Sequence, residues 1–136
     1  MTNSKLAAVS FAYEFPMGHR LQNHAGRCRH LHGHNYSVTV KYYGIVNEDG
    51  FVIDFSKLKA AVRGVLDPFD HAFVIECNDP CRDAIMPFGV IFTMQVPPSA
   101  ENLGRWWKDL LIQELKCSEI SLELEVRETR DCVAWI

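Results

Sequence analysis

Alternation of apolar and polar residues is the feature that most constrains the fold of this chain. Residues 9–15, 34–43, 90–96 and 119–128 each place an apolar side chain at every second position. Successive side chains of a β-strand point to opposite faces of the sheet, so these segments are predicted to be strands with one buried face each. Clean alternation is typical of an antiparallel sheet that is covered on one side only.

Two further segments repeat their apolar residues with the period of a helix. In residues 56–66 and 100–115 these positions recur at intervals of three and four, which gives each predicted helix one buried stripe. Residues 67–89 contain three prolines and a glycine and are predicted to be mostly loop. The Asp49-Gly50 turn predicts that a short strand follows it over residues 51–54. The predicted class is therefore α+β, with two helices covering the sheet.

Length and composition predict one ordinary soluble domain, residues 1–136. The net charge of −3 and the scattered positions of the 14 Lys and Arg residues argue against nucleic acid as a partner. No apolar stretch approaches the ~18 residues needed to span a membrane, so no membrane partner is expected. Five irregularly spaced cysteines and the absence of a secretory signal favour reduced thiols and a cytoplasmic location.

Three histidines occupy positions where the alternation predicts apolar side chains. His32 and His34 share the parity of the apolar residues in the second predicted strand, and His19 continues that of the first. Glu128 extends the apolar parity of the last strand in the same way. Burying such groups without partners costs a few kcal/mol each, and a shared metal ion would satisfy them. Three histidine nitrogens with an open fourth position are typical of catalytic zinc, whereas the alternative is hydrogen-bonded core histidines.

Two neighbouring groups could add chemistry to this site. Cys28 could be a fourth ligand that closes a structural site, or a base whose thiolate the zinc charge favours, and its spacing leaves both open. His30 has the opposite parity and is excluded as a ligand. Asp70 could raise the basicity of His71 and fix its tautomer. Adjacent strand residues face opposite ways, however, so these two side chains meet only if the backbone turns there.

Six short motifs follow one another in order over nearly the whole chain: Phe15-x-x-x-His19-Arg20-Leu21, Cys28-x-x-x-His32-Gly33-His34, Asp54-Phe55-Ser56-x-Leu58-Lys59, Asp70-His71, Ser99-Ala100-Glu101-Asn102-Leu103 and Glu128-Thr129. In this set the chain resembles the 6-pyruvoyl-tetrahydropterin synthase and 6-carboxytetrahydropterin synthase family. The resemblance implies the tunnelling fold, a four-stranded antiparallel sheet with two helices on one face. It also implies edge-to-edge trimeric barrels that stack into a homohexamer, with active sites between subunits.

Roles follow from the resemblance position by position. The matching residues are the zinc ligands His19, His32 and His34; the catalytic Cys28 with its partners Asp70 and His71; Glu128, which binds the pterin; and Glu101 and Ser99, which line the pterin pocket. A carboxylate suits a pterin because it accepts hydrogen bonds from two adjacent N–H donors at once. The family pattern has two small residues where this chain has Met17-Gly18, and residues 72–89 have no clear counterpart in shorter members.

The three-residue gap between Cys28 and His32 resembles the 6-carboxytetrahydropterin synthases of queuosine biosynthesis. That branch implies a zinc-dependent lyase which converts 7,8-dihydroneopterin triphosphate to 6-carboxytetrahydropterin and releases triphosphate and acetaldehyde. Cys28 and His71 would move protons in this reaction. A pyruvoyl-type synthase that releases only triphosphate is the alternative within the family, and a non-catalytic zinc-binding protein is the alternative outside it.

Overall fold

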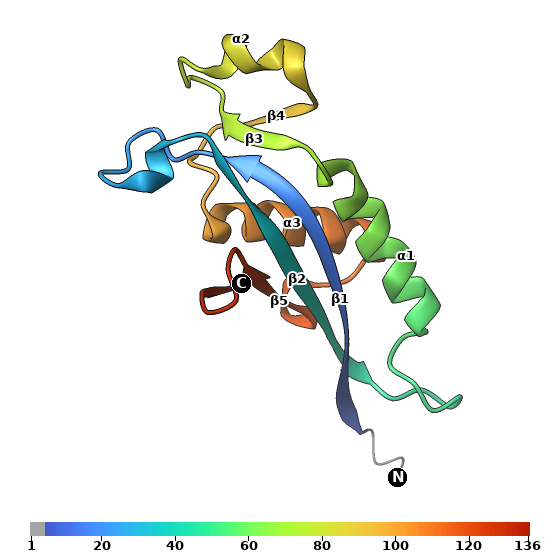
Figure 1. The fold of residues 1–136 in the computed structure, drawn as a ribbon. Coiled ribbons are helices and arrows are strands. Elements are labelled where there is room, and N and C mark those ends of the chain that lie inside the picture. Colours follow the sequence, from blue (N-terminus) through green and yellow to red (C-terminus); the bar gives the residue numbers. More distant parts are fainter. Residues whose placement is uncertain (1–4) are drawn as a thin grey trace.

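A six-stranded mixed sheet organises the computed structural model, which describes residues 5–136 (Figure 1). The strands are β1 (Leu6–His19), β2 (His32–Ile45), β3 (Phe73–Glu76), β4 (Ile91–Met94), β5 (Leu122–Arg127) and β6 (Val133–Trp135). The helices are α1 (Phe55–Leu66), α2 (Arg82–Ile85) and α3 (Ala100–Leu115). Within residues 5–136, no helix is both long and apolar enough to cross a membrane.

The strands lie in the order β4-β3-β1-β2-β5-β6. Strands β1 and β2 form the longest antiparallel pair, and β5 and β6 continue it in antiparallel fashion. On the other side β3 pairs in parallel with β1 and with β4. The sheet therefore joins an antiparallel half to a short parallel half, and β1 lies at the junction.

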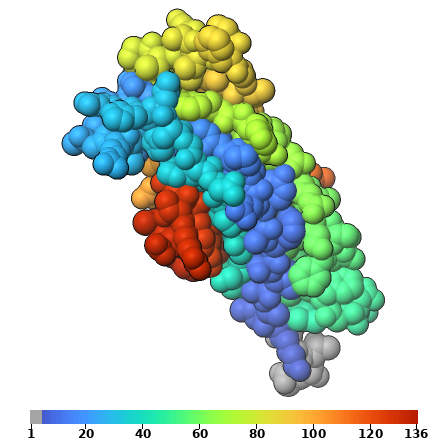
Figure 2. Space-filling view, viewed as in Figure 1, coloured from blue at the N-terminus to red at the C-terminus, as the bar shows by residue number. Residues whose placement is uncertain are grey.

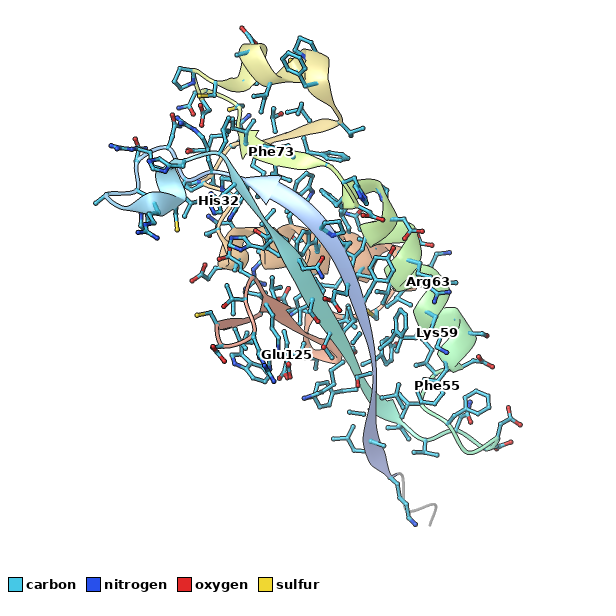
Figure 3. All side chains as sticks on the ribbon, in the orientation of Figure 1. His32, Phe55, Lys59, Arg63, Phe73 and Glu125 are labelled. Atoms are coloured by element: carbon cyan, nitrogen blue, oxygen red, sulfur yellow. The ribbon has the colours of Figure 1, made fainter. Side chains whose placement is uncertain are left out.

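Helices α1 and α3 cover one face of the sheet and pack against each other. The alternation of the sequence explains this, because the apolar positions of β1, β2 and β5 all point to the covered face. Trp107 of α3 lies at the centre, with its ring 5.7 Å from that of Phe15 and 6.0 Å from that of Tyr36. The opposite face carries polar side chains such as Glu125, which Figure 3 labels, and no helix of the described chain covers it.

Both long helices begin where the sequence supplies a capping side chain. Asp54 accepts a hydrogen bond of 2.7 Å from the backbone N–H of Ser56 at the start of α1. Ser99 accepts one of 3.2 Å from the N–H of Asn102 at the start of α3. Free N–H groups of a first helical turn are satisfied in this way, which fixes where each helix starts.

The four-stranded antiparallel sheet that the resemblance implied was wrong, because the sheet has six strands and β3 pairs in parallel with β1 and β4. Strand β3 was missed because Val74, Ile75 and Glu76 are all buried, so the segment shows no alternation and lies in a stretch with several prolines. The three residues of β6 are too few to produce a pattern. Residues 51–54 are not a strand, and the predicted last strand begins with a 3-10 turn at Glu119–Ser121. The two long helices were predicted to within one residue of their observed bounds.

Candidate active site

The three predicted metal ligands meet where β1 ends and β2 begins. Pairing of these strands places His19 opposite His32, and Met17 opposite His34. One nitrogen of each imidazole lies within 4.8 Å of the corresponding atoms of the other two. His32 marks this end of the sheet in Figure 3. The shared parity of the histidines in the sequence is thus realised as one cluster on the helix-covered face.

Backbone carbonyls fix the tautomers of two rings. Nδ1 of His19 lies 2.7 Å from the carbonyl oxygen of Pro98, and Nδ1 of His32 lies 2.6 Å from that of His30. A carbonyl can only accept, so each Nδ1 carries the proton and each neutral Nε2 presents a lone pair. Nε2 of His32 is buried and has no hydrogen-bond partner among residues 5–136. A cation bound at Nε2 would satisfy it.

Burial favours the neutral form of His19 and His34. It lowers the pKa of His19 to about 4, mainly because the charged ring would lose its water, and it also lowers the pKa of His34. Nε2 of His34 lies only 3.1 Å from Nε2 of His19, which brings a third nitrogen to the same point. Neutral imidazoles are the form that binds a metal. The donor set therefore fits a three-histidine zinc site with an open position.

A carboxylate and a phenol lie next to the histidines. Glu128 directly follows β5, and its two oxygens lie 3.8 Å from Nε2 of His19 and 3.9 Å from Nε2 of His34. The hydroxyl of Tyr36 donates to Glu128 over 3.4 Å and lies 3.2 Å from Nδ1 of His19. Sequence reasoning placed Tyr36 only in the core. Its parity with His34 was the signal that could have placed its hydroxyl at the site.

A cavity of about 190 Å³ opens beside Glu128. It brings together the three residues predicted to contact the pterin, Ser99, Glu101 and Glu128. The rest of its lining comes from Leu21, Ala100, Cys132, Val133 and Ala134. The last two of these residues belong to β6, the strand that the sequence did not reveal. The start of α3 and the end of β5 therefore form one hollow next to the histidine cluster.

Cys28 lies in the 3-10 turn Arg27–Arg29 and is half-buried. Its carbonyl oxygen accepts a hydrogen bond of 2.9 Å from the N–H of Leu21. Burial chiefly raises the pKa of Tyr36, and the charges of Glu128 and Cys28 add to this effect.

Asp70 and His71 meet because the backbone turns between them. His71 adopts a φ of 61°, in the left-handed region, and its Nδ1 lies 2.6 Å from Oδ1 of Asp70. The side chain of His71 is 81% exposed. It borders a second hollow of about 430 Å³ that also reaches His34, Gly18 and Gly33. Within the described chain, no hydrogen bond or ion pair joins Cys28 to this pair.

The two glycines near the histidines are explained by close packing. A Cβ at Gly18 would collide with the ring of Phe73 on β3. A Cβ at Gly33 would lie 3.0 Å from the carbonyl oxygen of Met17. The small residue between His32 and His34 thus allows the backbones of β1 and β2 to approach closely at the site.

Comparison with known proteins agrees with the geometry. The family described as 6-pyruvoyl tetrahydropterin synthase matches residues 8–136. The 6-carboxy-5,6,7,8-tetrahydropterin synthase of Haemophilus influenzae is 44% identical, over 91% of this chain and 95% of that protein. A probable 6-carboxy-5,6,7,8-tetrahydropterin synthase of Halobacterium salinarum is 39% identical, over 64% of this chain and 57% of that protein.

A solved structure shares the fold. The 6-pyruvoyl tetrahydropterin synthase of Plasmodium falciparum superposes with a TM-score of 0.75 at 27% identity, over 98% of both chains. The sheet with its covering helices is accordingly a tunnelling fold, as the resemblance implied. The chain belongs to the 6-pyruvoyl tetrahydropterin synthase family, a family of lyases.

Proposed function

We propose that this protein is a zinc-dependent 6-carboxytetrahydropterin synthase. Its substrate would be 7,8-dihydroneopterin triphosphate, and it would release triphosphate and acetaldehyde in a step of queuosine biosynthesis. The observation that carries the proposal is the contact of Glu128, which borders a cavity, with the Nε2 atoms of His19 and His34. A pterin bound at the carboxylate would have its side chain next to the metal site.

His19, His32 and His34 would hold the zinc ion through Nε2. When bound, zinc would supply Lewis-acid chemistry that acidifies the substrate side chain and stabilises the negative charge developing there. Cys28 would accept a proton as general base, and His71 would serve as the second acid–base group. Asp70 would hold the Nδ1–H of His71, which leaves Nε2 free for proton transfer.

Glu128 would orient the pterin. Its two oxygens can accept from two adjacent N–H donors of the pterin ring, while the hydroxyl of Tyr36 steadies one of them. Ser99 and Glu101 would complete the cavity at the start of α3. Burial of Tyr36 raises its pKa, so its hydroxyl keeps its proton and remains a donor.

We also propose a cytoplasmic homohexamer built from two trimeric barrels, with active sites between subunits. Two features of the chain support shared sites. The Asp70–His71 pair is exposed and forms no hydrogen bond or ion pair with Cys28 in the described chain, and one face of the sheet carries no helix. Sedimentation analysis should give six times the monomer mass, and a stable monomer with full turnover would contradict this assembly.

A pyruvoyl-type synthase is the second candidate, because the Plasmodium falciparum neighbour carries that name. Incubation of the pure protein with 7,8-dihydroneopterin triphosphate, with product identification by mass spectrometry, separates the two. A 6-carboxylated pterin and acetaldehyde are expected. A pyruvoyl pterin without acetaldehyde would indicate the second candidate, and failure to consume the substrate would refute both.

A matched pair of variants tests the cavity in the same assay. Glu128→Gln should raise KM by ~10²-fold, because an amide offers a donor where the pterin also presents one. Glu125→Gln makes the same chemical change on the opposite face of β5 and should leave KM unchanged. Equal KM values for the two variants would show that the pterin binds elsewhere.

A further inference from the structure

The segment between β3 and α2 contacts the loop that carries Cys28. Figure 2 shows the yellow-green segment that follows β3 against the blue loop of residues 20–31. Nε of Arg20 donates to Oδ2 of Asp79 over 2.6 Å. The two side chains are only 15% and 0% exposed. At the surface, Nε2 of Gln22 donates to Oδ1 of Asn78 over 2.8 Å. From the sequence alone, this segment is predicted to be mostly loop.

Arg20 reaches from Asp79 to the turn of Cys28. Its Nη1 donates over 3.2 Å to the carbonyl oxygen of Arg29, the residue that follows Cys28. On the other side, the N–H of Leu21 holds the carbonyl oxygen of Cys28 itself over 2.9 Å. Two consecutive carbonyls of this turn are therefore fixed by two consecutive residues that follow His19.

Asp79 is itself held rigidly. Its second oxygen accepts a hydrogen bond of 2.8 Å from the N–H of Cys81, and its own N–H donates to the carbonyl oxygen of Glu76 over 3.0 Å. Glu76 ends β3, which pairs with β1 at His19 through Val74. The acceptor for Arg20 is thus built on the same strands that carry the histidine cluster.

Desolvation makes a buried ion pair a poor source of stability, whereas its fixed geometry can define one arrangement of the chain. We propose that the Arg20–Asp79 pair is a positioning device that holds the turn Arg27–Arg29, so that Cys28 faces the reacting substrate. Asp79 acts through Cys28 and touches no substrate. The inference rests on the proposed role of Cys28 as general base.

The test compares Asp79→Asn with Asp83→Asn in the intact protein. Asp83 lies in the same segment, pairs with Arg82 over 3.1 Å and is 83% exposed, so the control makes the same change on a surface ion pair. We expect Asp79→Asn to lower kcat by ~10- to 100-fold, because small displacements of a reacting group are costly. KM should stay within about twofold, since the cavity at Glu128 is untouched. Bound zinc should be unchanged, and Asp83→Asn should behave as the wild-type protein.

Alkylation by iodoacetamide, followed residue by residue with mass spectrometry, gives a second measurement. Release of the turn should make Cys28 react several-fold faster in Asp79→Asn, while the exposed Cys132 provides an internal reference. Arg20→Lys is the second variant, for the case in which Asp79→Asn does not fold. A lysine keeps the positive charge but lacks the planar guanidinium that donates to Asp79 and to the carbonyl oxygen of Arg29 at the same time, so kcat should again fall.

Three results would overturn the inference. Unchanged kcat and unchanged Cys28 alkylation in Asp79→Asn or Arg20→Lys would show that the pair positions nothing. Loss of zinc in these variants would assign the pair to the metal site instead. Full turnover of Cys28→Ala would show that Cys28 is not the base on which the inference rests. This failure of the proposed function can be told apart from a failure of the positioning role, because the Cys28→Ala variant leaves Asp79 and Arg20 intact.

Discussion

The histidine cluster and the Asp70–His71 pair are both predicted to take part in the reaction, yet the chain builds them in opposite ways. His19 is 1% exposed, whereas the side chain of His71 is 81% exposed. Carbonyls of Pro98 and His30 hold the rings of His19 and His32, while the ring of His71 depends on one exposed carboxylate. The cluster lies on paired strands, and His71 lies at a turn with a positive φ.

This contrast supports the proposal that one chain completes the metal half of the site but not the acid–base half. The nitrogen donors converge, and Nε2 of His32 has no hydrogen-bond partner among residues 5–136, so the cluster is prepared for a cation. The side chain of His71 is exposed and forms no hydrogen bond or ion pair with Cys28 in the described chain. Substitutions in the histidine cluster should therefore change both zinc content and turnover, whereas substitutions at His71 should change turnover alone.

The largest effect is expected in the cluster. His34→Ala should lose bound zinc and lower turnover by roughly 10³-fold or more, because it removes one of three donors. His34 is only partly buried, so the variant should still fold. Zinc content by elemental analysis and turnover are the measurements.

His30→Ala is the matched control, since the backbone carbonyl that holds His32 remains and the side chain is exposed. Retention of zinc by His34→Ala, or its loss in His30→Ala, would show that the ligand set is wrong.

Cys28→Ala should lower turnover by ~10²- to 10⁴-fold while zinc stays bound. The thiol is proposed to move a proton and not to bind the metal, so turnover should fall while the zinc content stays the same. Cys117→Ala, at the far end of α3, controls for loss of a half-buried thiol. Loss of zinc from Cys28→Ala would instead make Cys28 a fourth ligand and favour a structural site.

His71→Asn should lower kcat by ~10²-fold with wild-type zinc content and little change in melting temperature. Asparagine tolerates a positive φ better than other replacements, so the turn is preserved. Equimolar mixing of His71→Asn with His34→Ala, after dissociation and reassembly, should restore roughly a quarter of wild-type turnover if sites are shared between subunits. No recovery from the reassembled mixture would place both halves in one chain.

A smaller effect should appear in the stability of the metal-free protein. Burial lowers the pKa of folded His19 to about 4, whereas the unfolded residue takes up a proton near pH ~6.5. The unfolded state therefore binds more protons below pH ~6.5, and stability falls as the pH falls toward 4. Urea unfolding should give a free energy about 2 kcal/mol lower at pH 5 than at pH 7. His30→Ala should keep this difference, and a free energy independent of pH would contradict a buried neutral His19.

The parity of the sequence predicted the histidine cluster because β1 and β2 are long and regular. Their register makes every second residue share a face, so His19, His32 and His34 could be grouped without coordinates. The carbonyl of Pro98, which fixes the tautomer of His19, could not be predicted in this way. Any residue type supplies a carbonyl, so such a contact leaves no trace in the sequence.

The less regular half of the molecule was harder to predict. The meeting of Asp70 with His71 depends on a positive φ at a residue other than glycine, which composition does not reveal. Strand β3 is buried on both faces, so it lacks the alternation that identified the other strands. The role inferred for Asp79 depends on β3, because that strand brings Asp79 beside Arg20.

Removal and return of the metal test the central claim most directly. Zinc should be withdrawn stepwise with a chelator and turnover of 7,8-dihydroneopterin triphosphate measured at each zinc content. Turnover should fall in proportion to bound zinc, reach zero without it and return when zinc is added, while the metal-free protein stays folded at pH 7. Turnover that is independent of zinc content would contradict a metal centre formed by His19, His32 and His34.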